Sequence, residues 1–276
     1  MRFQAVAARG VGALGVLVFA GILWVSSAQA DSSALDRFDV VVIDAGHGGE
    51  DRGARGAQGL IEKDLVLDVS LRLKRRLEAS GLTVLLTRET DLYVPLEARS
   101  ARANDARADL FLSIHANSAE RSAAKGFEVF FLSVDASDET AEQVAQRENS
   151  AFGSQAAVVA IGDPLVAVLG DMAVSEYMQE SDAFAKLAND RLQDLPKGLS
   201  RGVKQAPFVV LMGVQMPSAL VEIGFLSNPG EERALRADRR REEIARALTQ
   251  AVVDFGKRYD ALHGAEVRWD AANRSD

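Results

Sequence analysis

The sequence has no cysteine and only three histidines among its 276 residues. Without cysteine the chain cannot form a disulfide even in an oxidising compartment, and any metal ion has to be held by nitrogen and oxygen ligands. Basic residues are in the minority, because 32 lysines and arginines stand against 40 aspartates and glutamates, and the formal charge is −8. This balance argues against a general affinity for nucleic acid or anionic lipid.

Long apolar runs are scarce as well. One of them, residues 11–25, follows Arg2 and Arg9 and precedes the small-x-small sequence Ala28-Gln29-Ala30. This order is typical of a secretory signal, so we expect residues 1–30 to be removed on export to the periplasm. Contact with a membrane would then be limited to this segment before cleavage. An uncleaved membrane anchor is the alternative.

Beyond a short linker, predicted at residues 31–37, apolar runs alternate with helical patterns, as in βαβ units. We predict strands at 39–44, 83–88, 109–114, 126–132, 208–212 and 218–225, and helices at 62–80, 95–108, 137–150, 183–192 and 229–259. These elements predict one α/β domain over residues 38–262, followed by a polar tail, 263–276.

The stretch from 134 to 207 contains no obvious strand and is predicted to be an inserted helical segment of the domain. Its most apolar part, residues 156–170, is interrupted at its centre by Gly162, Asp163 and Pro164. A membrane span is excluded there, because the run is too short and is broken.

Two of the three histidines follow strongly apolar runs: His47 closes VVIDAGHGG and His115 closes LFLSIHAN. In a parallel sheet such positions lie at the carboxyl edge of the strands, where functional side chains gather. Glu62 begins a predicted helix on the same face as Leu65 and Val66, where a carboxylate needs a partner. Two imidazoles and one carboxylate with an open fourth position form the ligand set of catalytic zinc in hydrolases.

Each of these residues also has an ordinary structural interpretation. His47 is then a hydrogen-bonded histidine in a glycine turn, His115 a satisfied core histidine, and Glu62 a solvated glutamate favoured by the helix dipole. A phosphate loop is excluded, because GHGG lacks the lysine and the spacing of that motif. His263, in a polar stretch with no apolar strand before it, is interpreted as an ordinary surface residue.

Glu222 stands between Val221 and Ile223 in ALVEIGF. Strand alternation places its carboxylate on the face opposite these two branched side chains. Near a metal-activated water, such a glutamate can take up the proton and later donate it to a leaving nitrogen. A solvated glutamate on an edge strand is the alternative.

Five segments together resemble the zinc-dependent N-acetylmuramoyl-L-alanine amidases: VVIDAGHGGEDRGA, GLIEK, LEARSARAN, ADLFLSIHAN and MPSALVEIGFLSN. The resemblance runs from Val40 to about Arg258. It implies that His47, Glu62 and His115 bind zinc and that Glu222 is catalytic. It also implies a twisted, mostly parallel sheet of about six strands between helices.

The reaction implied by the resemblance is hydrolysis of the amide between N-acetylmuramic acid and L-alanine of the peptidoglycan stem peptide, by a monomeric enzyme. A zinc peptidase that cuts within the stem peptide and a catalytically silent wall-binding regulator stay open as alternatives. Arg52 departs from the family, which commonly has proline there. The change affects the rigidity of a turn rather than a ligand.

The insertion resembles the helical region of the division-associated amidases, in which a helix covers the active site until an activator with a LytM-type domain displaces it. This resemblance makes Glu148, in QREN, the candidate for a residue that blocks the metal at rest. An exposed helix glutamate is the alternative. Asp44 or Asn117 is expected to orient the imidazoles, although a packing role suits either equally.

Overall fold

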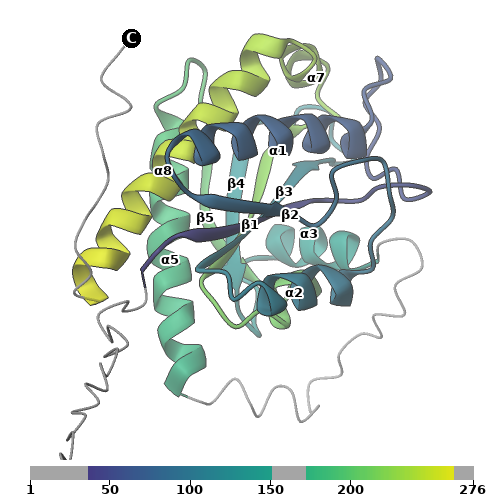
Figure 1. Ribbon diagram of the computed structural model, residues 1–276. Helices are drawn as coiled ribbons and strands as arrows, with labels where there is room; N and C mark the ends of the chain where they lie inside the picture. Colours follow the sequence, from purple (N-terminus) through teal and green to yellow (C-terminus); the bar gives the residue numbers. More distant parts are fainter. Residues whose placement is uncertain (1–36, 151–171, 264–276) are drawn as a thin grey trace, which may run out of the picture. The chain divides into compact units, whose positions relative to one another are not determined.

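Six strands form one sheet between two layers of helices in the computed structural model, which describes residues 37–150 and 172–263 (Figure 1). The order of the strands is β2-β1-β3-β6-β4-β5, and every neighbouring pair is parallel except β4 and β6. The predicted α/β fold with a mostly parallel sheet is therefore confirmed. The strands are β1 (Val40–Ala45), β2 (Thr83–Leu86), β3 (Leu110–Asn117), β4 (Phe127–Leu132), β5 (Ser200–Ala206) and β6 (Ser218–Phe225).

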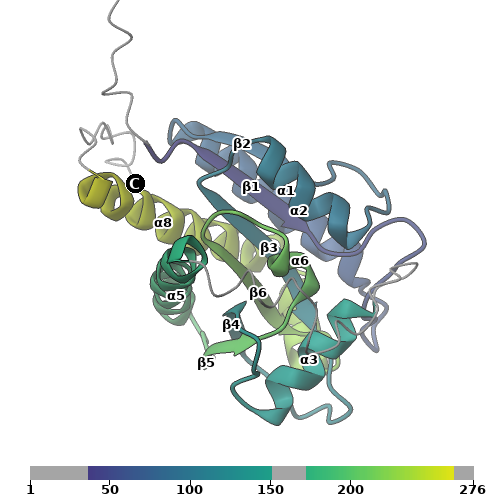
Figure 2. The same cartoon turned by 90° about the horizontal axis from the view of Figure 1, so that it is seen from below.

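Each face of the sheet packs on its own helices (Figure 2). Consecutive residues of β1 show why: Val41 and Ile43 belong to one apolar cluster and Val42 to the other, because side chains alternate along a strand. The first cluster includes residues of α1 (Glu62–Ala79), α5 (Met172–Gln193), α7 (Pro229–Leu235) and α8 (Asp238–His263). The second includes residues of α2 (Leu96–Asp105), α3 (Glu139–Asn149) and α6 (Val209–Met212).

Two predicted elements near residue 205 are wrong. The run at 208–212 is not a strand but contains the helix α6, whose Val210 and Leu211 are buried in the second cluster. A strand, β5, lies instead at Ser200–Ala206, inside the segment predicted to hold none. Periodicity cannot distinguish a short apolar helix from a short strand. The sequence SRGVKQA has few apolar residues because β5 is an edge strand and is only partly buried.

The predicted final helix is divided in two. Helix α7 ends at Leu235 and α8 begins at Asp238. No glycine or proline between these residues marks the change. Both helices bury apolar side chains, Leu235 in α7 and Ile244 in α8, in the first cluster. The break was therefore not predictable from local sequence.

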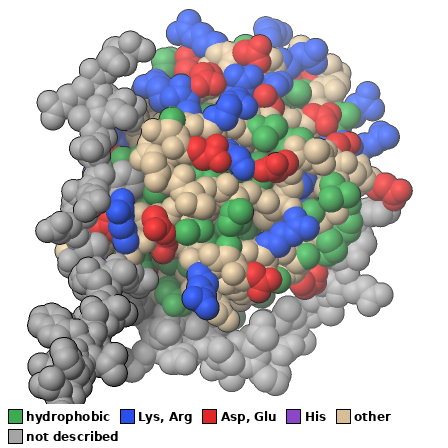
Figure 3. Space-filling model, viewed as in Figure 1, with side chains coloured by type: hydrophobic (Ala, Val, Ile, Leu, Met, Phe, Trp, Pro, Cys, Tyr) green, Lys and Arg blue, Asp and Glu red, His purple; other side chains and the backbone are tan. Residues whose placement is uncertain are grey.

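Helices α1 and α8 are joined at the surface by ion pairs. Arg72 contacts Asp68, Asp238 and Glu242, and Arg241 reaches Asp68. Figure 3, which shows this side of the molecule, has basic and acidic side chains interleaved over this region. Pairs at the surface contribute little individually, about 0–1 kcal/mol each. The contact between the helices therefore depends mainly on their apolar faces.

Contacts divide the chain after Ser33, and all described residues fall in the unit Ala34–Asp276. No helix within the described ranges is both long and apolar enough to cross a membrane. The predicted signal at 1–30, most of the linker at 31–37, the apolar stretch at 156–170 and the tail beyond His263 lie outside the described residues.

Candidate metal centre

His47 lies in the glycine turn that follows β1, in a backbone conformation that is unusual for a residue with a side chain. Its φ is +58°, in the left-handed region, which costs on the order of 1 kcal/mol or more. Arg99 Nη2 donates to the carbonyl of His47 at 2.8 Å, and the backbones of Gly48 and Asp51 bond to each other at 2.9 and 3.2 Å. These bonds hold the turn, so that the ring of His47 points inward over the edge of the sheet.

His115 comes from β3, the neighbour of β1, and its ring lies beside that of His47. The two ring centroids are 4.9 Å apart. Glycine makes this approach feasible: a Cβ atom on Gly46 would lie 2.4 Å from Cε1 of His115, and one on Gly53 would lie 2.5 Å from Oε2 of Glu62. The glycines around His47 therefore make room for the histidine and glutamate side chains of the site.

Glu62 is the first residue of α1 and is only 2% exposed, which excludes the solvated helix-start glutamate. Its Oε1 accepts the backbone N–H of Ala116 at 2.9 Å and lies 3.1 Å from His47 Nε2 and 3.2 Å from His115 Nδ1. Its Oε2 accepts the N–H of Ala54 at 2.7 Å. The carboxylate is thus fixed between the two imidazoles.

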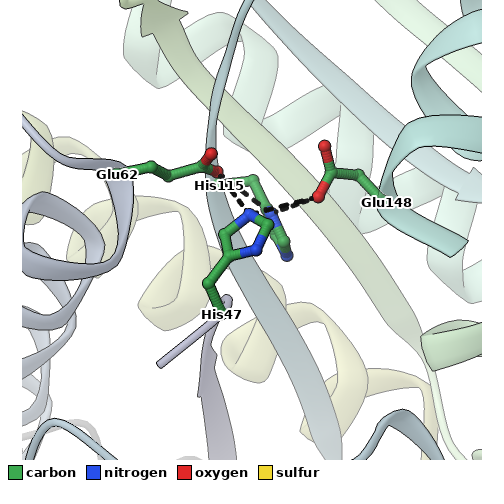
Figure 4. Close-up of side chains that lie close together, drawn as sticks. All are labelled: His47, Glu62, His115 and Glu148. Carbon is green, nitrogen blue, oxygen red and sulfur yellow. Dashed lines mark hydrogen bonds and ion pairs between the residues drawn. The ribbon is translucent and has the colours of Figure 1, made fainter. Parts of the chain in front are cut away.

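Glu148 approaches the imidazoles from the side opposite Glu62 (Figure 4). Its Oε2 lies 3.0 Å from His115 Nδ1 and 3.3 Å from His47 Nε2, and the residue is 6% exposed. The alternative of an exposed helix glutamate is therefore excluded. The four residues each offer one ligand atom, all within 4.8 Å of one another, and form a group that could bind a metal ion.

The charges of this group favour a cation. Burial alone lowers the pKa of both imidazoles, but the neighbouring carboxylates together outweigh it. Glu62, Asp51 and Glu148 hold the pKa of His47 well above its ordinary value, and Glu148 and Glu62 raise that of His115 to about 10. Burial likewise raises the pKa of Glu148, but the charge of His115 and the contacts with both imidazoles together outweigh it and lower this pKa to about 2. A potential that holds protons on these nitrogens also favours a divalent metal ion.

Two ligand atoms are also free for a metal. Nε2 of His47 and Oε2 of Glu148 are buried within contact distance of each other, yet neither makes an aligned hydrogen bond within the described ranges. Buried polar atoms of this kind are rare in native structures, and an ion or a water molecule can satisfy them. Imidazole and carboxylate donors without sulfur suit zinc and other divalent ions. The residues present therefore fit such a metal.

Glu222 occupies the central strand β6, in register with His115 on β3 and with Glu128 on β4. It is 0% exposed, which excludes the solvated edge-strand glutamate. Val221 and Ile223 pack in the first apolar cluster on the opposite face, as alternation predicts. Burial first, and then the charge of Glu148, raise the pKa of Glu222 well above its ordinary value. Neither of its oxygens has a hydrogen-bond partner in the described part of the chain.

Asp44 and Asn117, which were expected to orient the imidazoles, bond to other residues. Asp44 accepts hydrogen bonds from Thr87, Arg99 and Ser113, and Asn117 joins Arg147 to Glu128. No hydrogen bond joins either of them to an imidazole within the described residues. They are polar and follow apolar runs, as the histidines do, but the strands direct them to other partners.

Asp51, rather than Asp44 or Asn117, contacts an imidazole of the site. Its Oδ2 lies 2.9 Å from Nδ1 of His47. The only sequence signal was an acidic residue four positions after the histidine, inside the glycine turn. Arg52 is exposed beside it. His263, at the end of α8, stacks on Tyr259 with ring centroids 4.1 Å apart and is not among the four residues of the group.

Known proteins with similar sequences are amidases. The AmiC amidase of Escherichia coli O6:H1 is 36% identical over 229 residues, which are 82% of this chain and 55% of AmiC. The chain spans about half the length of the curated AmiC relatives that it matches.

Two solved structures are similar as well. AmiC2 of Nostoc punctiforme has a TM-score of 0.60 and 29% identity, over 79% of this chain and 96% of that one. The CwlD amidase of Clostridioides difficile, solved in complex with the GerS lipoprotein, has a TM-score of 0.60 and 26% identity, over 79% and 98%. Residues 41–254 match the family described as N-acetylmuramoyl-L-alanine amidase. The chain therefore belongs to the N-acetylmuramoyl-L-alanine amidase family.

Proposed function

We propose that this protein is a zinc-dependent amidase that hydrolyses the bond between N-acetylmuramic acid and L-alanine of the stem peptide in peptidoglycan. We place it in the periplasm, where that substrate lies, with a role in wall remodelling and daughter-cell separation. The observation that carries the proposal is the buried group of ligand atoms from His47, Glu62, His115 and Glu148, all within 4.8 Å. Family membership supports the choice of substrate.

Different residues would bind the metal and transfer the proton. His47, Glu62 and His115 would hold zinc, which supplies a Lewis acid that polarises the amide carbonyl and activates water at neutral pH. Glu222 would take a proton from the attacking water and give it to the leaving nitrogen as the C–N bond breaks. The products are the lactyl carboxylate of muramic acid and a peptide with a free amino terminus. Because its pKa is raised, the Glu222 carboxylate is a stronger base for taking up this proton.

Digestion of purified sacculi, followed by mass spectrometry, tests the reaction. We expect released stem peptides that begin with L-alanine, together with glycan whose muramic acid is intact, and we expect a chelator to abolish the release. Peptides trimmed internally would instead indicate a zinc peptidase. No product under any condition, including after removal of the Glu148 side chain, would indicate a silent wall-binding regulator.

We also propose that Glu148 occupies the open metal position at rest. Three neighbouring residues fasten the last turn of α3. Arg147 donates to Asn117 at 2.9 Å, Glu148 contacts both imidazoles, and Asn149 bonds to Pro207 and Val209 at 2.8 Å. Earlier in the helix, Ala141, Val144 and Ala145 are buried in the second apolar cluster. Moving only the last turn would open the site at less cost than removing the helix.

A block of this kind needs a partner that relieves it, and we propose an activator with a LytM-type domain. The similar CwlD amidase was solved as a complex with a second protein, the GerS lipoprotein. Restraint has a physical purpose here, because uncontrolled cleavage of the wall would lyse the cell.

Glu148→Ala is expected to raise the basal rate of sacculus hydrolysis by about 10-fold or more. This is the factor gained when a site that is blocked in about nine molecules of ten becomes open in all of them. The rate is measured without any activator. Glu142→Ala is the matched control, since Glu142 lies on the same helix but is exposed, and among the described residues its side chain bonds only to that of Gln146. A basal rate unchanged by Glu148→Ala would exclude the block.

A further inference from the structure

The two carboxylate oxygens of Asp51 have different partners, and one of them contacts the ring of His47. Oδ2 lies 2.9 Å from His47 Nδ1, and the side chains are only 10% and 7% exposed. Oδ1 accepts the backbone N–H of Gly53 at 3.1 Å. The backbone of Asp51 is paired with that of Gly48. The carboxylate therefore cannot turn away from the ring without breaking the bond to Gly53.

An ionised carboxylate only accepts hydrogen bonds, so Nδ1 of His47 has to carry a proton. In the neutral ring the lone pair then lies on Nε2. This atom is 3.1 Å from Glu62 Oε1 and 3.3 Å from Glu148 Oε2. His115, by contrast, turns Nδ1 to the same two oxygens, at 3.2 and 3.0 Å. The two histidines thus offer different nitrogens to one point.

We propose that Asp51 is a positioning residue for the metal: it keeps a proton on Nδ1 of His47 and so makes Nε2 the nitrogen that can ligate a metal, facing the group formed by Glu62, His115 and Glu148. The inference rests on the proposed function only in requiring that this group binds zinc. A carboxylate behind a metal-binding histidine fixes the tautomer and the orientation of the ring and strengthens it as a ligand.

The isosteric change Asp51→Asn separates this role from simple packing. An asparagine has one acceptor and one NH₂ donor in place of two acceptors. If its oxygen keeps the bond to Gly53, the NH₂ group faces Nδ1 and moves the ring proton to Nε2, where zinc should bind. If the amide is reversed, the NH₂ group opposes the N–H of Gly53. Zinc binding is penalised in both arrangements.

Asp51→Ala removes both bonds but imposes no donor on His47. The positioning role therefore predicts that zinc affinity falls in the order wild type, Asp51→Ala, Asp51→Asn. A role limited to holding the turn predicts the reverse order of the two variants, because alanine loses more contacts than asparagine. Asp51→Asn is expected to weaken zinc binding by about 10- to 100-fold, as for other partners behind a metal ligand.

Affinity is measured on the full chain by competition with a chromogenic zinc chelator. Asp91→Asn is the matched control: Asp91 also accepts a backbone N–H in this region, from Gly49 at 2.7 Å, and it pairs with Lys63 rather than with a histidine. Its zinc affinity should stay within twofold of wild type. Nitrogen-15 NMR of zinc-loaded, histidine-labelled protein provides a second readout, and with three histidines in the chain assignment is simple.

In the NMR spectrum we expect a proton on Nδ1 of His47 and zinc on Nε2. Equal zinc affinity of Asp51→Asn and wild type, or a proton on Nε2 of His47, would overturn the role of Asp51 while leaving the amidase proposal intact. A wild-type chain that binds no zinc would overturn both. Neither the zinc-affinity measurement nor the NMR spectrum depends on hydrolysis of sacculi. A failure of the proposed amidase reaction would therefore be recognised separately.

Discussion

Glu222→Gln is expected to lower the rate of sacculus hydrolysis by roughly 10²- to 10⁴-fold, the usual contribution of a general acid–base group. The amide has nearly the shape of the carboxyl group but cannot take up a proton from the attacking water. Zinc should remain bound at the wild-type stoichiometry, because Glu222 is not among the four residues of the metal group. Hydrolysis is measured on Glu148→Ala protein, with and without the change, to keep the site open.

The same substitution should stabilise the fold. Glu222 is fully buried without a hydrogen-bond partner in the described ranges, and burial raises its pKa well above the ordinary 4.5. A raised pKa means that the wild-type chain loses stability, relative to the neutral glutamine variant, as the pH rises above 4.5. In zinc-free protein, Glu222→Gln should therefore unfold at a higher temperature than wild type at about pH 8, and by a smaller margin at about pH 5.

Thermal unfolding followed by circular dichroism at both pH values measures this margin, and product analysis measures the rate. Full hydrolytic activity in Glu222→Gln would remove the residue from the mechanism. If Glu222→Gln instead unfolds at a lower temperature than wild type at about pH 8, the wild-type carboxylate has a stabilising partner. Together, lost activity and gained stability are typical of a group kept for chemistry at a cost to the fold.

Glu62→Gln should have the opposite effect on stability. Glu62 is 2% exposed, accepts the N–H groups of Ala54 and Ala116, and lies between both imidazoles. Breaking one side of a buried charged pair costs about 3–5 kcal/mol, because the remaining partners stay buried without compensation. Zinc affinity should fall by about 100-fold or more, beyond the loss typical of an outer partner, and hydrolysis should fall with it.

The pH dependence of Glu62→Gln has the opposite sign as well. Burial raises the pKa of Glu62, but the charge and hydrogen bonds of His47 and His115 hold it well below 4.5. A lowered pKa contributes stability above 4.5 that is lost as the pH falls through the folded-state pKa. The destabilisation in zinc-free Glu62→Gln should thus be complete near neutral pH and shrink in acid.

Glu232→Gln is the matched control for the loss of metal. Glu232 is also fully buried in the first turn of a helix and accepts backbone N–H groups, from Gln58 and Leu60, but it is not among the four residues of the metal group. It should lower the unfolding temperature and leave zinc stoichiometry unchanged. Undiminished zinc affinity in Glu62→Gln would exclude Glu62 as a ligand.

Local sequence was sufficient to predict features that depend on the ends or faces of individual strands and helices. The alternation around Glu222 predicted its face on β6, because a strand sends successive side chains to opposite sides. His47 and His115 were recognisable because each ends an apolar run, and parallel strands bring such ends to one edge. The helical spacing of Leu65, Val66 and Val69 likewise predicted the buried face of α1, on which Glu62 stands.

Only the tertiary structure decided what depends on the packing of separate elements. The approach of Glu148 to the imidazoles requires α3 to pack on the second apolar cluster, and no local pattern specifies which helix covers which strand end. The choice of Asp51 over Asp44 and Asn117 depends on a turn in which His47 has a left-handed backbone. The edge strand β5 escaped notice because partial burial leaves little hydrophobic signal. Residue types and their periods thus predicted which side chains gather at this edge of the sheet, whereas distances between elements, which depend on how whole faces pack, determined their partners.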